Sequence, residues 1–383
     1  MILESQTIGK SCEVGDGTHS KIEREDSGVL YLTCRNFKDG RVDYSKVYYI
    51  SEKNFTKYFK NGKKALICPQ PGDLVFSIIG TIGEPYLVRD TDRFGISSSV
   101  AIVRSKPENV DPMFLYYWMR GPKFQSALFA TKGGVAQGYV SLEMIKSLPA
   151  PTLPLPTQRK IAGILSAYDD LIENNLRRIK ILEEMAQSLY REWFVHLRFP
   201  GHDSVQFIDS ELGQIPNGWE VGKLEDVLVL QRGFDLPKAE RAAGDIPIYA
   251  ASGITGYHSE SKVKGPGIVT GRSGTIGQVV YIHEDFWPLN TALWVKAFPR
   301  SEPLYAYFVL SSIDLKGFNS GAAVPTLNRN DIHSLQTLIP PIALQSRFQE
   351  CAGAMLAQAR ILTLSIQNLR RTRDLLLPQL LTP

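Results

Sequence analysis

The sequence lacks the patterns that mark secreted, membrane-spanning or disulfide-stabilised proteins. No apolar run approaches the ~18 residues that a membrane span needs, and the N-terminal MILESQTIGK has no basic region followed by an apolar stretch. The cysteines lie far apart without a C-x-x-C pair, which is typical of free thiols in a reducing compartment. We therefore expect a cytoplasmic protein. The four cysteines are Cys12, Cys34, Cys68 and Cys351.

The common catalytic motifs are also missing. The methyltransferase signature Asn/Asp-Pro-Pro-Tyr/Phe and the phosphate-binding loop are absent, and no two histidines form an H-x-x-x-H pair. The glycines of Gly271–Gly277 have the wrong spacing for a dinucleotide loop, so we expect turns there. Asp245 with Glu260-Ser261-Lys262 resembles a nuclease pattern, but E-x-K is common by chance and the first half of the chain has no counterpart. We expect no catalytic residue, bound metal or cofactor on this chain.

The composition is that of an ordinary globular protein. The 383 residues can form two or more domains with full cores. The formal net charge of +4 and the pI near 8.7 permit a polyanionic partner without requiring one.

The most distinctive feature is a long amphipathic stretch from Gln158 to Val195. It has no proline and one glycine, Gly163, and its apolar residues recur every three or four positions, with Asn175 as a polar exception. This pattern predicts a coiled-coil helix roughly 57 Å long whose apolar seam must be covered. The predicted seam residues are Ile161, Leu165, Tyr168, Ile172, Ile179, Leu182 and Leu189.

A second stretch, Gln345–Leu377, repeats the pattern, with Arg373 at its polar position. Gln345 follows Gln158 by 187 residues, and prolines precede both stretches. The repeat indicates a duplicated chain, and the two helices would cover each other most simply in antiparallel orientation. The seam residues of this second stretch are Phe348, Met355, Leu362, Ile366 and Leu369.

The segments that precede the two helices are duplicated as well. Each copy is expected to contain a short helix running into a turn, an apolar strand that ends in Gly-Thr-Ile-Gly, and a further helix. The matched segments are Thr7–Gly17 with Lys223–Gly233, Leu74–Ile79 with Gly267–Val269, and Phe114–Met119 with Tyr305–Leu310. We expect an α+β protein with domains at 1–156 and 198–340, a central helix at 157–197 and a distal helix at 341–383.

Several polar residues are candidates for DNA contact, although each type is also common on ordinary solvated surfaces. The lysines of Lys53–Lys64 fall at helical spacing and could contact phosphates. Arginines beside turns could contact guanine bidentately, and glycine-rich loops could approach a groove closely. The candidates are Arg35, Lys53, Lys57, Lys60, Lys64, Lys132, Gln137, Tyr139, Arg232, Tyr257, Lys262, Arg272, Asn319 and Arg329.

The order of these parts resembles the specificity subunit of type I restriction-modification enzymes. Residues 158–194 with RFPG at 198–201 resemble the family's central conserved region. Pieces of its target recognition domains are similar to GQIPNGWE, QRGFDLP, IPIYAASGITGYH, GRSGTIG and VPTLNRNDI, and the distal conserved region is similar to IPPIALQ and LLLPQLL. The resemblance covers nearly the whole chain, although the first copy has no equivalent of GQIPNGWE.

The resemblance implies two similar target recognition domains, separated by an antiparallel coiled coil of two long helices. Each domain would read one half of a bipartite double-stranded DNA target, and the helices would set the spacer. Two modification subunits carrying S-adenosylmethionine would dock on the chain, and restriction subunits would add ATP- and Mg²⁺-dependent activity. The specificity subunit itself would be non-catalytic. Because recognition domains vary strongly, base-contacting residues cannot be transferred from relatives.

Two other hypotheses compete with this one. A non-catalytic coiled-coil adaptor that binds proteins would show no salt-dependent DNA affinity, whereas a DNA-reading subunit would. An autonomous methyltransferase or nuclease would form product from DNA without partner subunits.

Overall fold

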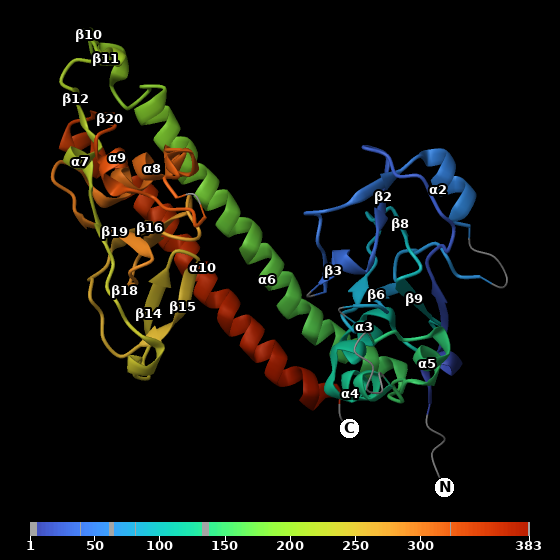
Figure 1. Ribbon diagram of the computed structural model, residues 1–383. Coiled ribbons are helices and arrows are strands. Elements are labelled where there is room, and N and C mark those ends of the chain that lie inside the picture. Colours follow the sequence, from blue (N-terminus) through green and yellow to red (C-terminus); the bar gives the residue numbers. More distant parts are fainter. Residues whose placement is uncertain are drawn as a thin grey trace. The chain divides into compact units, whose positions relative to one another are not determined.

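The chain forms two compact units. The computed structural model describes residues 6–38, 40–60, 65–80, 82–131, 138–321 and 323–381, and Figure 1 shows its elements. Unit 1 comprises Met1–Asn174 and Ser365–Pro383, and unit 2 comprises Asn175–Leu364. Each of two long helices, α6 (Leu155–Tyr190) and α10 (Ile342–Leu381), therefore contributes residues to both units.

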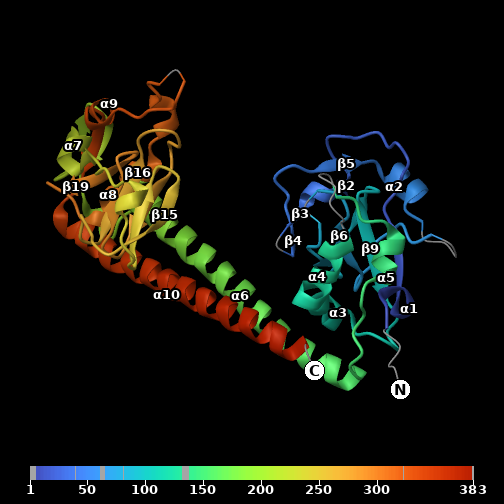
Figure 2. The same cartoon turned by 60° about the horizontal axis from the view of Figure 1, so that its bottom comes forward.

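The long helices run antiparallel in each unit, as the sequence predicts. In unit 1, Asp169 of α6 forms an ion pair with Arg373 near the end of α10. In unit 2, Trp193 in the π-helical turn that continues α6 packs against Phe348 near the start of α10. Figure 2 shows α6 in green and α10 in red.

The seam residues follow the helical period onto the covered side of each helix. All twelve are buried or half-buried, and the polar Asn175 is buried among them. Apolar residues outside the seam period, such as Leu171 and Ile361, are exposed. The periodic pattern therefore separates covered from exposed faces along both helices.

The duplication is visible in the sheets. Each unit has a four-stranded antiparallel sheet, in the order β1-β9-β6-β7 or β13-β19-β16-β17. Their strands are β1 (Cys12–Asp16), β6 (Leu74–Ser77), β7 (Tyr86–Leu87), β9 (Val100–Ser105), β13 (Val229–Arg232), β16 (Gly267–Gly271), β17 (Val279–Ile282) and β19 (Ala292–Ala297).

A three-stranded sheet accompanies each four-stranded sheet. Its central strand, β2 or β14, pairs antiparallel with one neighbour and parallel with the other. The same mixed pairing in both units confirms the internal duplication. The strands are β2 (Val29–Leu32), β5 (Tyr48–Ile50), β8 (Phe94–Ile96), β14 (Ile246–Ala250), β15 (Gly253–His258) and β18 (Trp287–Pro288).

The predicted short helices before β1 and β13 exist as α1 (Ile8–Ser11) and α7 (Leu224–Val227), although each runs into a strand rather than directly into a turn. The predicted helices at 114–119 and 305–310 are α3 (Pro112–Arg120) and α8 (Pro303–Ser312). Both begin with a proline after an acidic N-cap residue, where proline is well tolerated. Their apolar sides enter the main core of each unit.

The remaining elements connect these layers. After the central helix, residues 207–216 fold as a hairpin of β10 and β11. The other elements are β3 (Phe37–Lys38), β4 (Arg41–Val42), α4 (Pro122–Thr131), α5 (Leu142–Ser147), β10 (Phe207–Ser210), β11 (Gly213–Pro216), β12 (Glu220–Lys223), α9 (Arg329–His333), β20 (Gln336–Ile339) and the short helices η1 (Cys34–Asn36), η3 (His202–Ser204), η4 (Lys238–Glu240) and η5 (Leu315–Phe318).

The lysine-bearing helix is shorter than predicted. Helix α2 spans only Glu52–Tyr58, and Phe59 leaves the helical conformation. The Phe59 ring is buried against Tyr31 and sits over Gly95, which directs the chain toward the β2-β5-β8 sheet. Figure 2 shows α2 beside this sheet. The prediction of one helical lysine face through residue 64 is therefore wrong, because core packing ends the helix before Lys60.

The Gly-Thr-Ile-Gly segments form turns, as expected. In unit 2, Gly274 and Gly277 have φ values of +93° and +97°, which favour glycine. The matched glycines of unit 1 also have positive φ. A Cβ on Gly277 would collide with the Lys316 side chain, whereas one on Gly274 would meet no protein atom. The requirement for glycine at Gly274 is therefore set by its backbone conformation.

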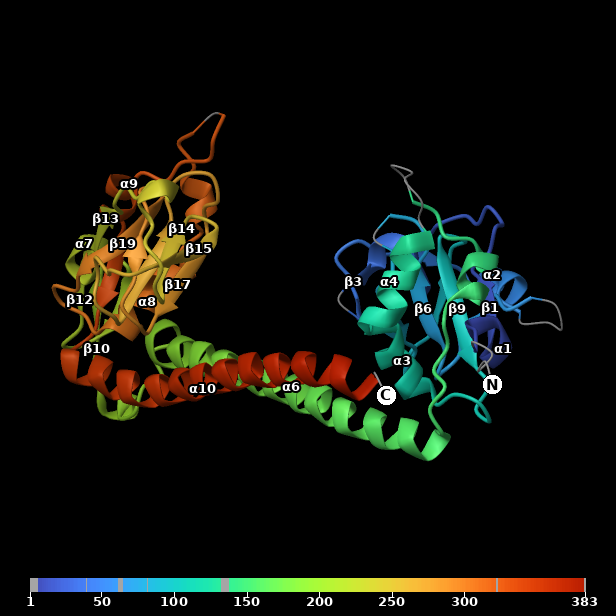
Figure 3. The ribbon, with the colours of Figure 1, turned by 90° about the horizontal axis from the view of Figure 1, so that it is seen from below.

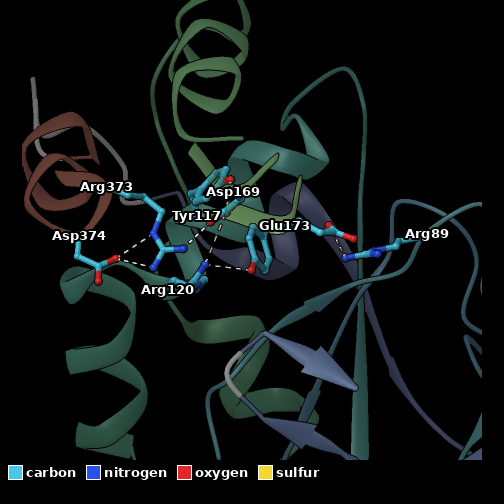
Figure 4. A network of polar contacts seen from close by, with 8 residues as sticks. Arg89, Tyr117, Arg120, Asp169, Glu173, Arg373 and Asp374 are labelled. Carbon is cyan, nitrogen blue, oxygen red and sulfur yellow. Dashed lines mark hydrogen bonds and ion pairs between the residues drawn. The ribbon is translucent and has the colours of Figure 1, made fainter. Parts of the chain in front are cut away.

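A polar network joins the two long helices in unit 1 (Figure 4). The Asp169 carboxylate accepts a hydrogen bond from the Tyr117 hydroxyl at 2.7 Å and pairs with Arg373, which is only 13% exposed. Arg373 also pairs with Asp374 at 2.8 Å. Burial, followed by the Asp169 hydrogen bond, raises the pKa of the Tyr117 hydroxyl, which keeps this group a donor.

Breaking the Asp169–Arg373 pair is expected to destabilise unit 1 by about 1–3 kcal/mol, since one half-buried charge would lose one of its partners. Asp169→Asn and Arg373→Met, combined in a double-mutant cycle, isolate the pair. Hydrogen exchange of peptides from residues 112–131 measures the effect. Glu184→Gln, which breaks the exposed pair with Lys180, serves as control and should change little. Additive effects of the two substitutions would contradict the prediction.

Candidate nucleic-acid interface

Several loops meet at one edge of the four-stranded sheet of unit 2. The chain after β13 bridges to Leu289, just before β19. The chain after β16 bridges to Thr326, and the Arg272 carbonyl accepts a hydrogen bond from the Leu327 N–H at 2.8 Å. The orange segment between η5 and α9 extends beyond the sheets of unit 2 in Figure 3. We call this set of loops the loop edge of unit 2.

Unit 1 has an equivalent loop edge. Thr18, after β1, bridges to Ser97, which corresponds to the bridge between Phe234 and Leu289. Ile79, after β6, bridges to Tyr139, which corresponds to the bridge after β16. The two units therefore present the same loops from the same strands.

The loop edge of unit 2 borders a cationic depression over β13 and α9. This open depression has a volume of about 720 Å³, and its lining includes Arg232, Lys296 and Arg329 with a single carboxylate, Asp235. Arg232 lies 3.7 Å from Asp235 and remains half-exposed, while Arg329 donates to the Leu230 carbonyl at 3.4 Å. Guanidinium groups with unused donors are suited to phosphates and guanine edges.

Two other candidates of this edge hold the loops in place. The Arg272 Nε donates to the Asn290 carbonyl at 2.9 Å, and this side chain is half-buried. The Asn319 side-chain oxygen accepts the N–H groups of Gly321 and Thr326, both at 3.0 Å. Arg272 and Asn319 thus shape the loops that flank the depression.

In unit 1, Arg35 is exposed on η1 near the equivalent edge. Serines anchor η1, because Ser77 donates to the Cys34 carbonyl at 2.7 Å and Ser99 accepts the Cys34 N–H at 3.1 Å. Tyr139 is 53% exposed at the bridge with Ile79. Arg35 and Tyr139 are therefore accessible residues on a fixed backbone.

The other candidates lie elsewhere. Lys53 and Lys57 are exposed on α2, and Lys60 follows that helix. Tyr257 is 56% exposed on β15, and the Lys262 ammonium lies 4.8 Å from the centre of the Trp287 ring. Three further candidates, Lys64, Lys132 and Gln137, lie outside the described residues.

Sequence reasoning missed two residues of the depression. Lys296 is exposed near the end of β19, where buried residues alternate with accessible ones, and this alternation was the available signal. His333 comes from α9, and its Nε2 accepts the Leu230 N–H at 2.8 Å. Nothing in the sequence around His333 indicates this long-range contact.

The stability of unit 2 is expected to fall as the pH drops below the ordinary histidine pKa of about 6.5. Burial lowers the pKa of His333, and Arg329 lowers it further against an opposing effect of Glu225. The folded protein therefore binds this proton more weakly than the unfolded chain does. The stabilisation is complete when the pH lies above the pKa of His333 in the unfolded chain. It is lost as the pH falls through the lower pKa of His333 in the folded protein.

Thermal melting of the wild type and His333→Gln between about pH 7.5 and about pH 5.5 tests this expectation. Glutamine can still accept the Leu230 N–H but does not titrate, so the variant should lose part of the pH dependence. The exposed His196 supplies the control variant His196→Gln. An unchanged pH profile in His333→Gln would contradict the role of this ring.

The described part of the chain lacks two further features. Within it, no group of three or more His, Cys, Asp or Glu side chains could hold a metal ion. None of the helices there is long and apolar enough to cross a membrane.

Comparison with known proteins connects this architecture to one family. Residues 20–184 and 216–350 match the model of the type I restriction modification DNA specificity domain. The type I restriction enzyme MjaIX specificity subunit of Methanocaldococcus jannaschii is 25% identical over 70% of this chain and 67% of its own length. The MjaVIII specificity subunit of the same organism is 28% identical over 51% of this chain and 44% of its own length.

A solved structure shares the fold. The S subunit of a type I restriction-modification system from M. genitalium superposes with a TM-score of 0.65 at 17% identity, over 99% of this chain and 96% of that one. The family match covers most strands of both units and the loop edge of unit 2, and it favours DNA reading over a protein-binding adaptor. The chain belongs to the family of type I restriction-modification DNA specificity subunits.

Proposed function

We propose that this chain selects a bipartite DNA sequence for a type I restriction-modification complex. Its recognition domains, 1–156 and 198–340, each read one half of the target through their loop edges. The long helices set the distance between the halves. The duplication of the loop edge carries this proposal, since two equivalent readers in one chain suit a target with two parts.

The chemistry of the loop edges supports this function. In unit 2, three cations and one carboxylate line the depression beside the loops. Phosphate contacts would position each domain, and side chains on the loops would read base edges. Arg35 and Tyr139 are the accessible counterparts in unit 1.

The chain would act with partner subunits in the cytoplasm. Two modification subunits dock on the long helices and methylate adenine with S-adenosylmethionine. Restriction subunits add cleavage that depends on ATP and Mg²⁺. The chain itself supplies binding and orientation.

Mapping methylated adenines genome-wide, in cells given this chain and its modification subunit, tests the function. We expect one split motif with a fixed gap. The DNA affinity of the purified complex should also fall steeply as the salt concentration rises, because cationic side chains that contact phosphates release counterions from the DNA. A continuous motif, or affinity that does not respond to salt, would overturn the proposal.

A further inference from the structure

Two buried glutamines occupy the same place in the two units. Gln158 is in the first turn of α6, and Gln345 is in the first turn of α10. Both side chains are fully buried, with 0% exposure. A buried amide is costly unless its polar atoms are hydrogen-bonded, so their partners define what these residues hold together.

In unit 1 the partners come from two other segments of the chain. The Gln158 Oε1 accepts the N–H of Asp111, the N-cap residue of α3, at 3.0 Å. Its Nε2 donates to the carbonyl of Asn109 at 3.2 Å and to that of Leu153 at 2.7 Å. One amide therefore joins the start of α6, the segment leading into it, and the start of α3.

Unit 2 repeats this arrangement bond for bond. The Gln345 Oε1 accepts the N–H of Glu302, the N-cap residue of α8, at 2.9 Å. Its Nε2 donates to the carbonyls of Arg300 at 3.2 Å and Pro340 at 2.8 Å. We call each of these hydrogen-bonded sets an amide joint.

The residue after each glutamine strengthens its joint. Arg159 lies 3.9 Å from the Asp111 carboxylate, and the Ser346 hydroxyl donates to the Glu302 carboxylate at 2.8 Å. Each joint therefore fixes a helix of the recognition domain to a long helix through three backbone groups. Removing the amide would leave these three backbone groups without their side-chain partner.

We propose that Gln158 and Gln345 are positioning residues that fix the angle of each recognition domain on its long helix. They thereby determine which spacer length the chain accepts. The proposal rests on the proposed function. A domain of ~150 residues has a radius of about 20 Å, so a rotation of about 10° at the joint moves its edge by roughly 3.5 Å. That displacement is about one base-pair step of DNA.

The test uses the complex of the full chain with its modification subunit. The probes are duplexes carrying the motif that methylation mapping returns, with the native gap or with one base pair added or removed. Gln158→Met, Gln345→Met and the double variant remove the hydrogen bonds at nearly constant volume. Leu310→Ala destabilises α8 away from the joint and serves as the control, because Leu310 is fully buried.

For the methionine variants, we expect the preference for the native gap to fall about tenfold or more. Discrimination against a wrong base in either half should stay within about twofold of the wild type. Ser346→Ala, which removes only the adjoining bond, should shift the gap preference in the same direction by less. This milder variant decides the question if the methionine variants do not fold.

The proposal would be overturned if the folded variants at Gln158, Gln345 and Ser346 kept the gap preference of the wild type. It would also be overturned if Leu310→Ala changed the gap preference as much as the methionine variants do. A wild-type complex with no gap preference would also overturn the proposed function. Failure of the positioning role alone leaves the split motif and the wild-type gap preference intact, so the two failures are distinguishable.

Discussion

Replacing Phe348 by alanine is expected to lower the free energy of unfolding of unit 2 by about 3–5 kcal/mol. Phe348 is fully buried near the start of α10. Its ring lies 5.1 Å from Phe194, 5.6 Å from Phe308 and 6.0 Å from Trp193, measured between centroids. The substitution would remove these ring contacts, two of them edge-on, and leave a cavity where both long helices meet α8.

Urea unfolding followed by tryptophan fluorescence measures this loss, because four of the five tryptophans belong to unit 2. Ile361→Ala is the matched control, since Ile361 lies on the same helix and is 59% exposed. The control should change stability by less than about 1 kcal/mol. Equal losses in the two variants would show that the aromatic cluster does not hold the helices to the domain.

The sequence predicts the long helices and the duplication well because both are repeated, local patterns. The seam spacing depends only on the helical period, so it separates covered residues from exposed ones without knowledge of the fold. The prolines before each helix predict its start to within a few residues of Leu155 and Ile342. Arg373 is recognisable as a polar exception in the seam.

The contacts that shape the candidate interface are not predictable in this way, because they join distant segments. Asp169, the partner of Arg373, lies beside the seam residue Tyr168 rather than in the seam period. The end of α2 depends on Phe59 finding a place over Gly95. His333 and Lys296 reach the depression only because α9 and β19 flank β13. Tertiary packing determines these positions, whereas propensity and period determine the helices.

Reversing two charges of the depression, Arg232→Glu with Arg329→Glu, is expected to weaken DNA binding by about 2–6 kcal/mol, or roughly 30-fold to 10⁴-fold. Both guanidinium groups line the same depression beside the loop edge of unit 2. Glutamates there would repel phosphate and would lose any bidentate contact with guanine. Titration of the complex with target duplex, at several salt concentrations, measures the change.

The double variant Lys223→Glu with Lys264→Glu is the matched control, because it makes the same charge change at exposed residues of unit 2 outside the depression and off the long helices. The comparison also separates the two kinds of contact. Loss of phosphate contacts weakens binding to all DNA sequences alike and lowers the salt dependence of the affinity. Loss of base contacts instead relaxes the sequence preference. Since both arginines belong to unit 2, any relaxed positions should fall in one half of the split motif. Two results would show that the depression is not part of the DNA-reading surface. One is an equal loss of DNA affinity in the control variant, and the other is a relaxed sequence preference in both halves of the motif.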